Sequence, residues 1–164
     1  TRSSDLKMSG RDGYAAYDEK LLEVDRSQLG FSVAQISEGM PGGFLVYRAD
    51  ESEEILYANK KLMEIYECKT IEEFIEFTGG SFKGCVHEDD LSLIEGAIES
   101  QASQYDGYDY VRYRAKTAKG RVIQIEDFGR RQRTDDGDVF YVFMLDMNDK
   151  KDLYDFASDS KRGR

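Results

Sequence analysis

Histidine, proline and cysteine are scarce in this chain of 164 residues, with one, one and two copies respectively. Cys68 and Cys85 have neither the spacing of a zinc site nor the pattern of a disulfide framework. No apolar run approaches the roughly 18 residues that a membrane-spanning helix needs. The first residues, TRSSDLKMSGRDGY, also lack the apolar core of a signal peptide. These absences predict a cytoplasmic protein, or the cytoplasmic part of a larger, membrane-anchored one.

Charge is unevenly distributed along the sequence, and the formal net charge is −10. Residues 35–105 contain 15 acidic and 5 basic side chains, whereas residues 106–134 contain 8 basic and 4 acidic ones. Binding to nucleic-acid phosphates needs clustered positive charge, so the net negative charge of the chain argues against a nucleic-acid partner. The basic stretch follows two expected strands, which favours a solvated sheet face with cross-strand ion pairs over a docking surface for an acidic partner.

The segment before Pro41 has the heptad spacing of a helix with one apolar seam. Such a seam either packs on the domain's own sheet or pairs with a second copy of the chain, and we expect pairing to contribute more. The residues of this flanking helix are Leu22, Leu29, Val33, Ile36 and Met40.

After Pro41 the apolar period changes from helical to alternating, and the pattern predicts two strands, several helices and then three longer strands. The last strand, Val139–Leu145, is apolar on both faces, which indicates a central strand. The expected strands are 44–48, 55–58, 108–116, 121–131 and 139–145, and the expected helices start at Asn59, Ile71 and the VHEDD stretch.

The stretch VHEDD contains the only histidine, followed directly by three carboxylates. With His87 as N-cap, Asp90 at the third helical position can reach back to the free N–H of the cap. Consecutive residues at a helix start cannot all converge on one ion, so a metal site is disfavoured. No nucleophile or oxyanion donor is evident nearby for acid/base catalysis. We therefore interpret the motif as a helix start and expect no catalytic residue and no metal ligand.

Five stretches in the same order and spacing resemble the PAS domain, over about residues 35–149. ISEGMPGGF (36–44) is similar to the family's approach to the first strand, and Tyr57-Ala58-Asn59 to the end of its second. VHEDD is similar to the start of its long helix, with Glu88 where proline is usual. The stretch from Tyr113 to Gly120 is similar to its hairpin. Asp146-Met147-Asn148 stands where the family has Asp-Ile-Thr.

The resemblance implies an α+β fold, with a five-stranded antiparallel sheet, helices on one face and an N-terminal flanking helix on the other. It also implies a non-enzymatic sensory module of the PAS-3 or PAS-9 type from a bacterial signalling protein. We therefore expect a flanking helix at 1–34, a PAS domain at 35–149 and the start of an output linker at 150–164. The expected partners are a second copy of the chain and an effector in the same polypeptide, of the GGDEF diguanylate cyclase or histidine kinase type.

Several ligand classes are compared through the same resemblance. Haem is disfavoured because the long helix carries no histidine, although Cys85 could in principle supply a thiolate. Flavin is disfavoured because neither cysteine lies in an Asn-Cys-Arg-type motif. A pocket for an uncoloured metabolite and a filled core stay equally open, and Tyr66, Tyr110 and Arg112 are the predicted pocket residues.

The exit of the last strand is the predicted output junction. In the family the aspartate at this position couples the strand to the output helix, which assigns that role to Asp146. Asn148 is expected to cap a helix that begins at Asp149.

Overall fold

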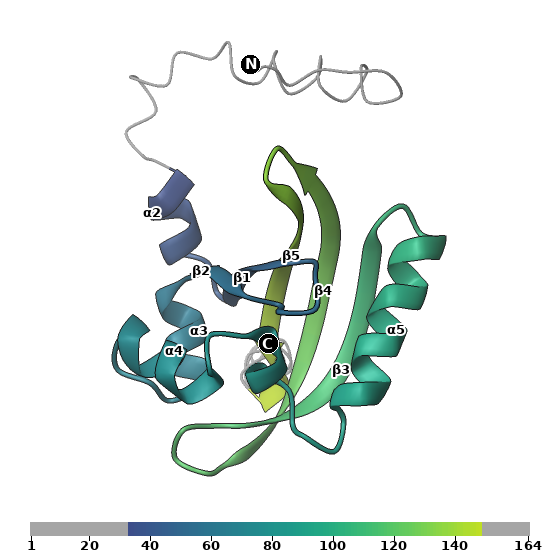
Figure 1. Ribbon diagram of the computed structural model, residues 1–164. Helices are drawn as coiled ribbons and strands as arrows, with labels where there is room; N and C mark the ends of the chain where they lie inside the picture. The colour runs from purple at the N-terminus through teal and green to yellow at the C-terminus, as the bar shows by residue number, and fades with distance from the viewer. Residues whose placement is uncertain (1–32, 149–164) are drawn as a thin grey trace, which may run out of the picture. The chain divides into compact units, whose positions relative to one another are not determined.

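The computed structural model describes residues 33–148, which form an α+β fold of five strands with helices between the second and third (Figure 1). The predicted fold class is confirmed. None of the helices in the described part is long and apolar enough to cross a membrane. The elements are α2 (Val33–Glu38), β1 (Gly43–Arg48), β2 (Ile55–Ala58), α3 (Lys60–Ile65), α4 (Ile71–Thr78), the 3₁₀ helix η3 (Phe82–Cys85), α5 (Leu91–Gln104), β3 (Tyr108–Lys116), β4 (Val122–Thr134) and β5 (Gly137–Asp146).

The five strands form one antiparallel sheet in the order β2-β1-β5-β4-β3. The last strand, β5, therefore lies at the centre between β1 and β4, as its apolar sequence predicts. Along β3 burial alternates residue by residue, so that Asp109, Val111, Tyr113 and Ala115 face the core. Tyr108, Tyr110 and Arg112 face the opposite side.

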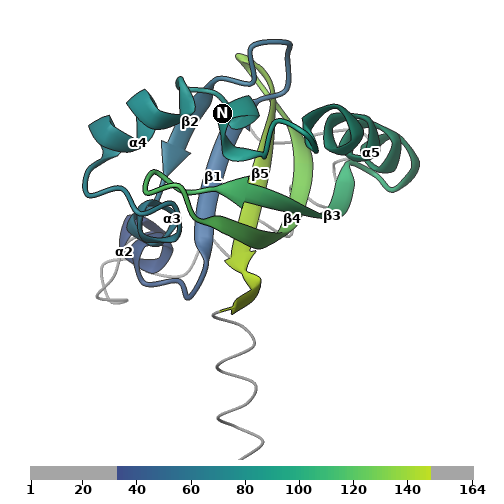
Figure 2. The ribbon, with the colours of Figure 1, turned by 90° about the horizontal axis from the view of Figure 1, so that it is seen from below.

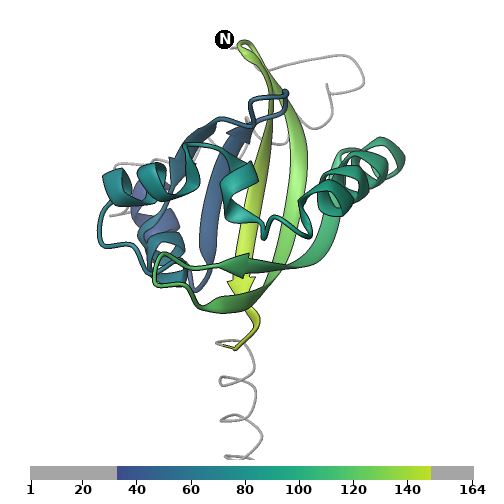
Figure 3. The ribbon, with the colours of Figure 1, turned by 60° about the horizontal axis from the view of Figure 1, so that its bottom comes forward.

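Helices α3, α4 and α5 lie on the same face of the sheet, with α3 and α4 near β1 and β2 and with α5 near β3 (Figures 2 and 3). The hydrophobic core fills the space between this face and the helices. The predicted N-terminal helix on the opposite face depends mainly on residues outside the described part. The largest fully buried apolar side chains are Tyr66, Phe74, Phe82, Leu45, Leu62, Ile123, Ile125 and Met144.

Asn59 connects the beginning of β1 to the start of α3. Its Oδ1 accepts hydrogen bonds from the Leu62 N–H (3.1 Å) and from the Phe44 N–H (2.9 Å). Its Nδ2 donates to the carbonyls of Ser37 (2.7 Å) and Gly42 (3.2 Å). The side chain is fully buried, and it is the N-cap of α3, as predicted.

An aromatic row crosses the face of the sheet that points away from α3, α4 and α5. Tyr110, Phe128, Phe143 and Phe44 occupy successive paired positions on β3, β4, β5 and β1. The rings of Tyr110 and Phe128 are 4.9 Å apart, and both side chains are at least 40% exposed. Exposed aromatic surface of this kind commonly marks an interaction site.

Candidate functional site

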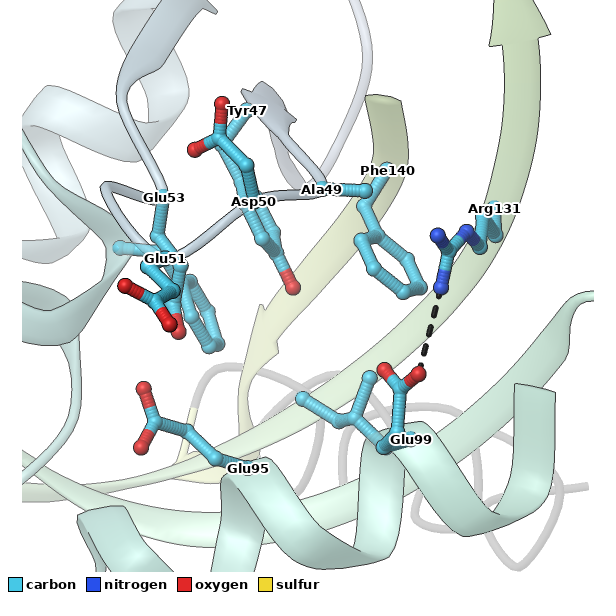
Figure 4. A pocket seen from close by; sticks show the side chains of 11 residues that line it. Tyr47, Ala49, Asp50, Glu51, Glu53, Glu95, Glu99, Arg131 and Phe140 are labelled. Carbon is cyan, nitrogen blue, oxygen red and sulfur yellow. Dashed lines mark hydrogen bonds and ion pairs between the residues drawn. The ribbon is translucent and has the colours of Figure 1, made fainter. Parts of the chain in front are cut away.

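A pocket of about 280 Å³ lies between the core face of the sheet and α5 (Figure 4). The turn between β1 and β2 forms one wall, and η3 contributes Phe82 from the side. The pocket is lined by Tyr47, Ala49, Asp50, Glu51, Glu53, Phe82, Glu95, Ile98, Glu99, Arg131 and Phe140.

Three aromatic rings form the apolar part of the pocket. The Tyr47 ring stacks on Phe82 at a centroid distance of 4.5 Å and on Phe140 at 5.3 Å. β5 supplies Phe140 directly opposite Tyr47 of β1 in the strand register, so sheet pairing fixes this contact. The stack is a rigid wall against which an apolar or cationic group can pack.

The Tyr47 hydroxyl points into the open space of the pocket (Figure 4). The residue is only 3% exposed, and its hydroxyl has no hydrogen-bond partner among residues 33–148. Burial raises the pKa of Tyr47, and the negative charges of Asp127, Asp109 and Glu53 raise it further. The hydroxyl therefore stays protonated and is available to a ligand.

Glu53 and Glu95 face each other across the Lys83 ammonium. Lys83 Nζ lies 3.1 Å from Glu53 Oε2 and 2.7 Å from Glu95 Oε2. The other Glu53 oxygen, Oε1, is buried and has no hydrogen-bond partner within the described part of the chain. Burial and the interaction with Glu95 raise the pKa of Glu53 to about 7, while Lys83 opposes the shift.

Arg131 is the one basic side chain among the pocket's lining residues, and it is already paired. Its Nη1 lies 3.3 Å from Glu99 Oε1, the contact drawn in Figure 4, and its Nε lies 2.9 Å from Asp138 Oδ2. Since both ends of the guanidinium have carboxylate partners, Arg131 contributes little free positive charge to the pocket.

Two further carboxyl groups lie deeper in the core. Asp127 accepts a hydrogen bond from the Tyr113 hydroxyl (2.7 Å), and burial raises its pKa to about 8. Asp109 has no hydrogen-bond partner for either oxygen in the described region, and burial raises its pKa to about 7. Gly129 lies opposite Asp109 on β4, and a Cβ there would come within 2.7 Å of Asp109 Oδ2. The glycine thus provides the space that the carboxyl group occupies.

The three predicted pocket residues do not lie together. Tyr66 is fully buried in the core, where its hydroxyl donates to the Cys85 carbonyl (2.6 Å). Tyr110 and Arg112 are on the opposite face of the sheet, where the Tyr110 hydroxyl donates to Glu126 Oε2 (2.5 Å). The three cannot line one cavity, because consecutive strand residues alternate between faces and the predicted register was one residue off.

VHEDD precedes a helix, as predicted, but the details of the predicted cap are wrong. Helix α5 begins at Leu91, and His87 Nδ1 instead accepts a hydrogen bond from the Asp89 N–H (3.1 Å) in the turn before it. The His87 N–H donates to the Arg114 carbonyl. The Asp90 carboxylate accepts three hydrogen bonds from Arg114, from its backbone N–H (2.9 Å), its Nε (3.1 Å) and its Nη2 (2.6 Å). These hydrogen bonds lower the pKa of Asp90 to about 2 and fasten α5 to β3.

The end of β5 has a side-chain cap, but the capping residue differs from the prediction. Met147 and Asn148 are already helical, and Asp146 Oδ1 accepts a hydrogen bond from the Asn148 N–H (3.0 Å). Asp146 is therefore the cap that was assigned to Asn148. Arg112 reaches this junction from β3, since its Nη2 donates to Met147 Sδ (3.5 Å).

Both cysteines are buried free thiols. Burial raises the pKa of each thiol, that of Cys85 most strongly. A thiolate ligand for haem is thus disfavoured at Cys85 in this conformation. Within residues 33–148 no group of three or more His, Cys, Asp or Glu side chains is placed to hold a metal ion.

The predicted flanking helix is described only in part. Leu22 and Leu29 lie outside the described residues. Val33 and Ile36 belong to α2, and Ile36 is 45% exposed. Met40 follows the end of α2 at Glu38, so the helical seam does not extend to it.

Neither a protein-family model nor a curated protein matches the sequence. Among solved structures, the chain is similar to a PAS domain from a two-component sensor histidine kinase, with 10% identity, a TM-score of 0.54, and coverage of 80% of this chain and 98% of that one. A PAS domain from Colwellia psychrerythraea has 17% identity and a TM-score of 0.56, and the match covers 69% of this chain and 92% of that one. A third similar structure is the PAS domain, in complex with ethanol, of a LuxR-family transcriptional regulator from Burkholderia thailandensis. It has 19% identity and a TM-score of 0.54, and the match covers 70% of this chain and 98% of that one.

The described domain therefore has the PAS fold. The predicted resemblance to PAS domains is confirmed at the level of the fold.

Sequence reasoning missed the residues that line the pocket. Tyr47 and Glu53 come from β1 and the turn that follows it, whereas Glu95 comes from α5, much later in the sequence. The available signal was the alternation in β1, which places Tyr47 on the same face as Leu45. Glu53 gave no such signal, because an acidic residue in a turn ordinarily faces solvent.

Proposed function

We propose that the chain is a sensory and dimerisation PAS module of a bacterial signalling protein. Its pocket receives a small molecule, and the end of β5 passes the change to an effector in the same polypeptide, of the diguanylate cyclase or histidine kinase type. Residues 35–149 are the sensory domain, 1–34 its flanking helix, and 150–164 the start of the output linker. The histidine kinase origin of one similar structure supports this proposal.

The observation that carries the proposal is the course of β5. The strand contributes Phe140 to the pocket wall and ends at Asp146, whose carboxylate caps the following helical residues. A ligand that displaces the stacked rings of Tyr47 and Phe140 shifts the same strand that holds the output junction. Strands transmit such shifts because their ladder hydrogen bonds keep neighbouring residues in register.

The aromatic row on the outer face favours a second role, in which the domain acts without a ligand as an interaction module. In that role the apolar seam of the flanking helix, with Leu22, Leu29, Val33 and Ile36, pairs with a second copy, and the exposed aromatics on the sheet join the interface. The two roles are compatible, because the pocket and the row lie on opposite faces of the sheet.

Native mass spectrometry of the untreated protein, repeated under denaturing conditions, separates these roles. A dimer with an additional mass that disappears on denaturation is expected for an occupied receptor. A bare dimer supports the ligand-free interaction module, and a bare monomer would contradict the proposed dimer.

Replacing Asp146 tests the output junction. Asp146→Ala removes the acceptor of the Asn148 N–H, so effector activity in the parent protein should no longer respond to the input signal while the domain stays folded. Circular dichroism checks the fold. An unfolded variant, or one whose response is unchanged, would refute the assigned role.

A further inference from the structure

We propose that the pocket binds a small organic cation, with a primary ammonium group on an apolar body. This inference specifies the ligand class of the proposed receptor and rests on that proposed function. It is built from the charge of the lining residues, the unused acceptors and the aromatic wall.

The lining residues make the pocket strongly acidic. Five of them are carboxylates, namely Asp50, Glu51, Glu53, Glu95 and Glu99, and one is basic. The basic residue, Arg131, is neutralised by Glu99 and Asp138. In Figure 4 the side chains of Glu51, Glu53 and Glu95 gather on the side of the pocket away from Arg131. Lys83 balances only part of this negative charge, so an anionic ligand would be repelled there, whereas a cation would be attracted.

The site already holds one ammonium group of its own. Lys83 places its Nζ within 3.1 Å of Glu53 and 2.7 Å of Glu95, and it lies at the rim, with 42% of its side chain exposed. Glu53 Oε1 is left buried with no hydrogen-bond partner among the described residues. A buried acceptor of this kind is costly unless a donor reaches it, and the N–H groups of a bound ammonium supply such donors.

Tyr47 is the second, independent feature that points to a ligand. Tyr47 is only 3% exposed, and its hydroxyl points into the pocket (Figure 4). This hydroxyl has no hydrogen-bond partner among the described residues. The oxygen can accept from an ammonium, while the stacked rings of Tyr47, Phe82 and Phe140 accommodate the apolar body and offer cation–π contact.

The size and lining of the pocket limit the cation to a small organic one. A volume of about 280 Å³ lies just below the usual range for small-molecule sites. Calcium would require six or more oxygen ligands around one point, and no group of three or more His, Cys, Asp or Glu side chains in residues 33–148 is placed to hold a metal ion. An amine on a short alkyl or aryl body uses both the carboxylates and the rings.

The proposal is tested with three compounds that share a phenyl-substituted two-carbon skeleton but carry a positive, a neutral or a negative group. Isothermal titration calorimetry on the full chain uses 2-phenylethylamine, 2-phenylethanol and phenylacetate, with 1,5-diaminopentane and calcium chloride as further probes. We expect saturable binding of at least one of the two amines with a Kd below about 1 mM, and binding at least about tenfold weaker for the alcohol and the acid. Failure of both amines, or preferential binding of phenylacetate, 2-phenylethanol or calcium, would overturn the proposal.

Variants locate the binding. Glu53→Gln and Tyr47→Phe should weaken amine binding by about tenfold and about threefold, because they remove a charged acceptor and a hydroxyl. Glu76→Gln removes the same charge from the exposed side of α4 and should change nothing. If Glu53→Gln does not fold, Glu95→Gln replaces it. Equal amine binding by all variants would refute the site. The proposed function is judged separately, by whether effector activity in the parent protein with Asp146→Ala still responds to the input signal.

Discussion

Glu53 adopts a left-handed backbone conformation, with φ of 49°, while its side chain is only 15% exposed. This conformation costs a residue with a Cβ about 1–2 kcal/mol. The Glu53 N–H donates to the Asp50 carbonyl, and the Glu53 carbonyl accepts from the Phe82 N–H, so the turn and η3 hold the backbone in place. The strain accompanies the placement of a carboxyl group against the pocket, as is common at functional sites.

Two substitutions at Glu53 separate backbone strain from side-chain chemistry. Glu53→Gly and Glu53→Ala both remove the carboxyl group, but only glycine relieves the left-handed conformation. The glycine variant should therefore be more stable than the alanine variant by about 1 kcal/mol. Urea unfolding measures the difference, and equal stabilities would show that the turn relaxes to another conformation.

Asp127 should make the stability of the domain fall as the pH rises. Its pKa is about 8 in the folded protein and near 3.8 in the unfolded chain, so the folded state binds more protons between these values. The free energy of unfolding then decreases with rising pH from about 4 to 8, by at most about 1.4 kcal/mol per pH unit for this group. Asp127→Asn keeps an acceptor for the Tyr113 hydroxyl and should flatten the dependence.

Urea unfolding of the wild type and of Asp127→Asn at several pH values between about 5 and 8 tests this sign. Asp109 and Glu53 also have raised pKa values and should leave a residual slope in the variant. If the free energy of unfolding depends on pH equally in the wild type and in Asp127→Asn, the pH dependence does not come from Asp127.

At the scale of secondary-structure elements, Asn59 and Thr70 show how much one cap can contribute. Both are N-caps, but Thr70 accepts one hydrogen bond, from the Glu73 N–H (3.1 Å), whereas Asn59 makes four and is fully buried. Asn59→Ala leaves several buried backbone groups without partners and should cost about 3 kcal/mol or more. Thr70→Ala should cost about 1 kcal/mol.

Chemical denaturation of both alanine variants provides the comparison. A similar, small loss for the two would mean that water replaces the Asn59 side chain between β1 and α3.

The elements of this fold were predictable because local patterns specify them. The strands β1 and β2 and the cap at Asn59 follow from alternation and capping chemistry, and they lie where the sequence predicts them. The face of β3 was harder, since Asp109 interrupts an otherwise apolar inward row and made Tyr110 the more plausible inward residue. Burial raises the pKa of this carboxyl group to about 7, and that burial depends on residues elsewhere in the sequence.

The pocket was not predictable for a related reason. Its charge comes from a turn and a helix that meet only in the folded domain, and surface acids carry no local sign of such a meeting. The basic stretch at 106–134 forms the expected cross-strand ion pairs only in part. Arg114, Arg121 and Arg130 pair with Asp90, Glu67 and Asp106, which lie outside the sheet, while Arg131 and Arg133 pair with Asp138 of β5.

At the scale of the whole molecule, the outer aromatic row provides a test of self-association. Phe128→Glu places a charge at the centre of the row and should shift a dimer to the monomer, since burying an unpaired carboxylate costs several kcal/mol. Tyr105→Glu, at the end of α5, introduces the same charge at an exposed aromatic residue away from the sheet and should leave the dimer intact.

Analytical ultracentrifugation of both variants and the wild type measures the effect. Dimers of equal strength in all three would place the interface elsewhere, for example on the flanking helix alone.

The close approach of Gly129 to Asp109 has an evolutionary consequence. A methyl group at position 129 and a carboxyl group at position 109 cannot occupy the same space, so neither position is free to change by itself. Among descendants of a common ancestor the two sites should vary together. Lineages that keep the acid keep the glycine, and those that acquire a larger residue at 129 replace the acid with something smaller. Such paired substitutions would mark which branches have retained an ionisable group in the core and which have abandoned it.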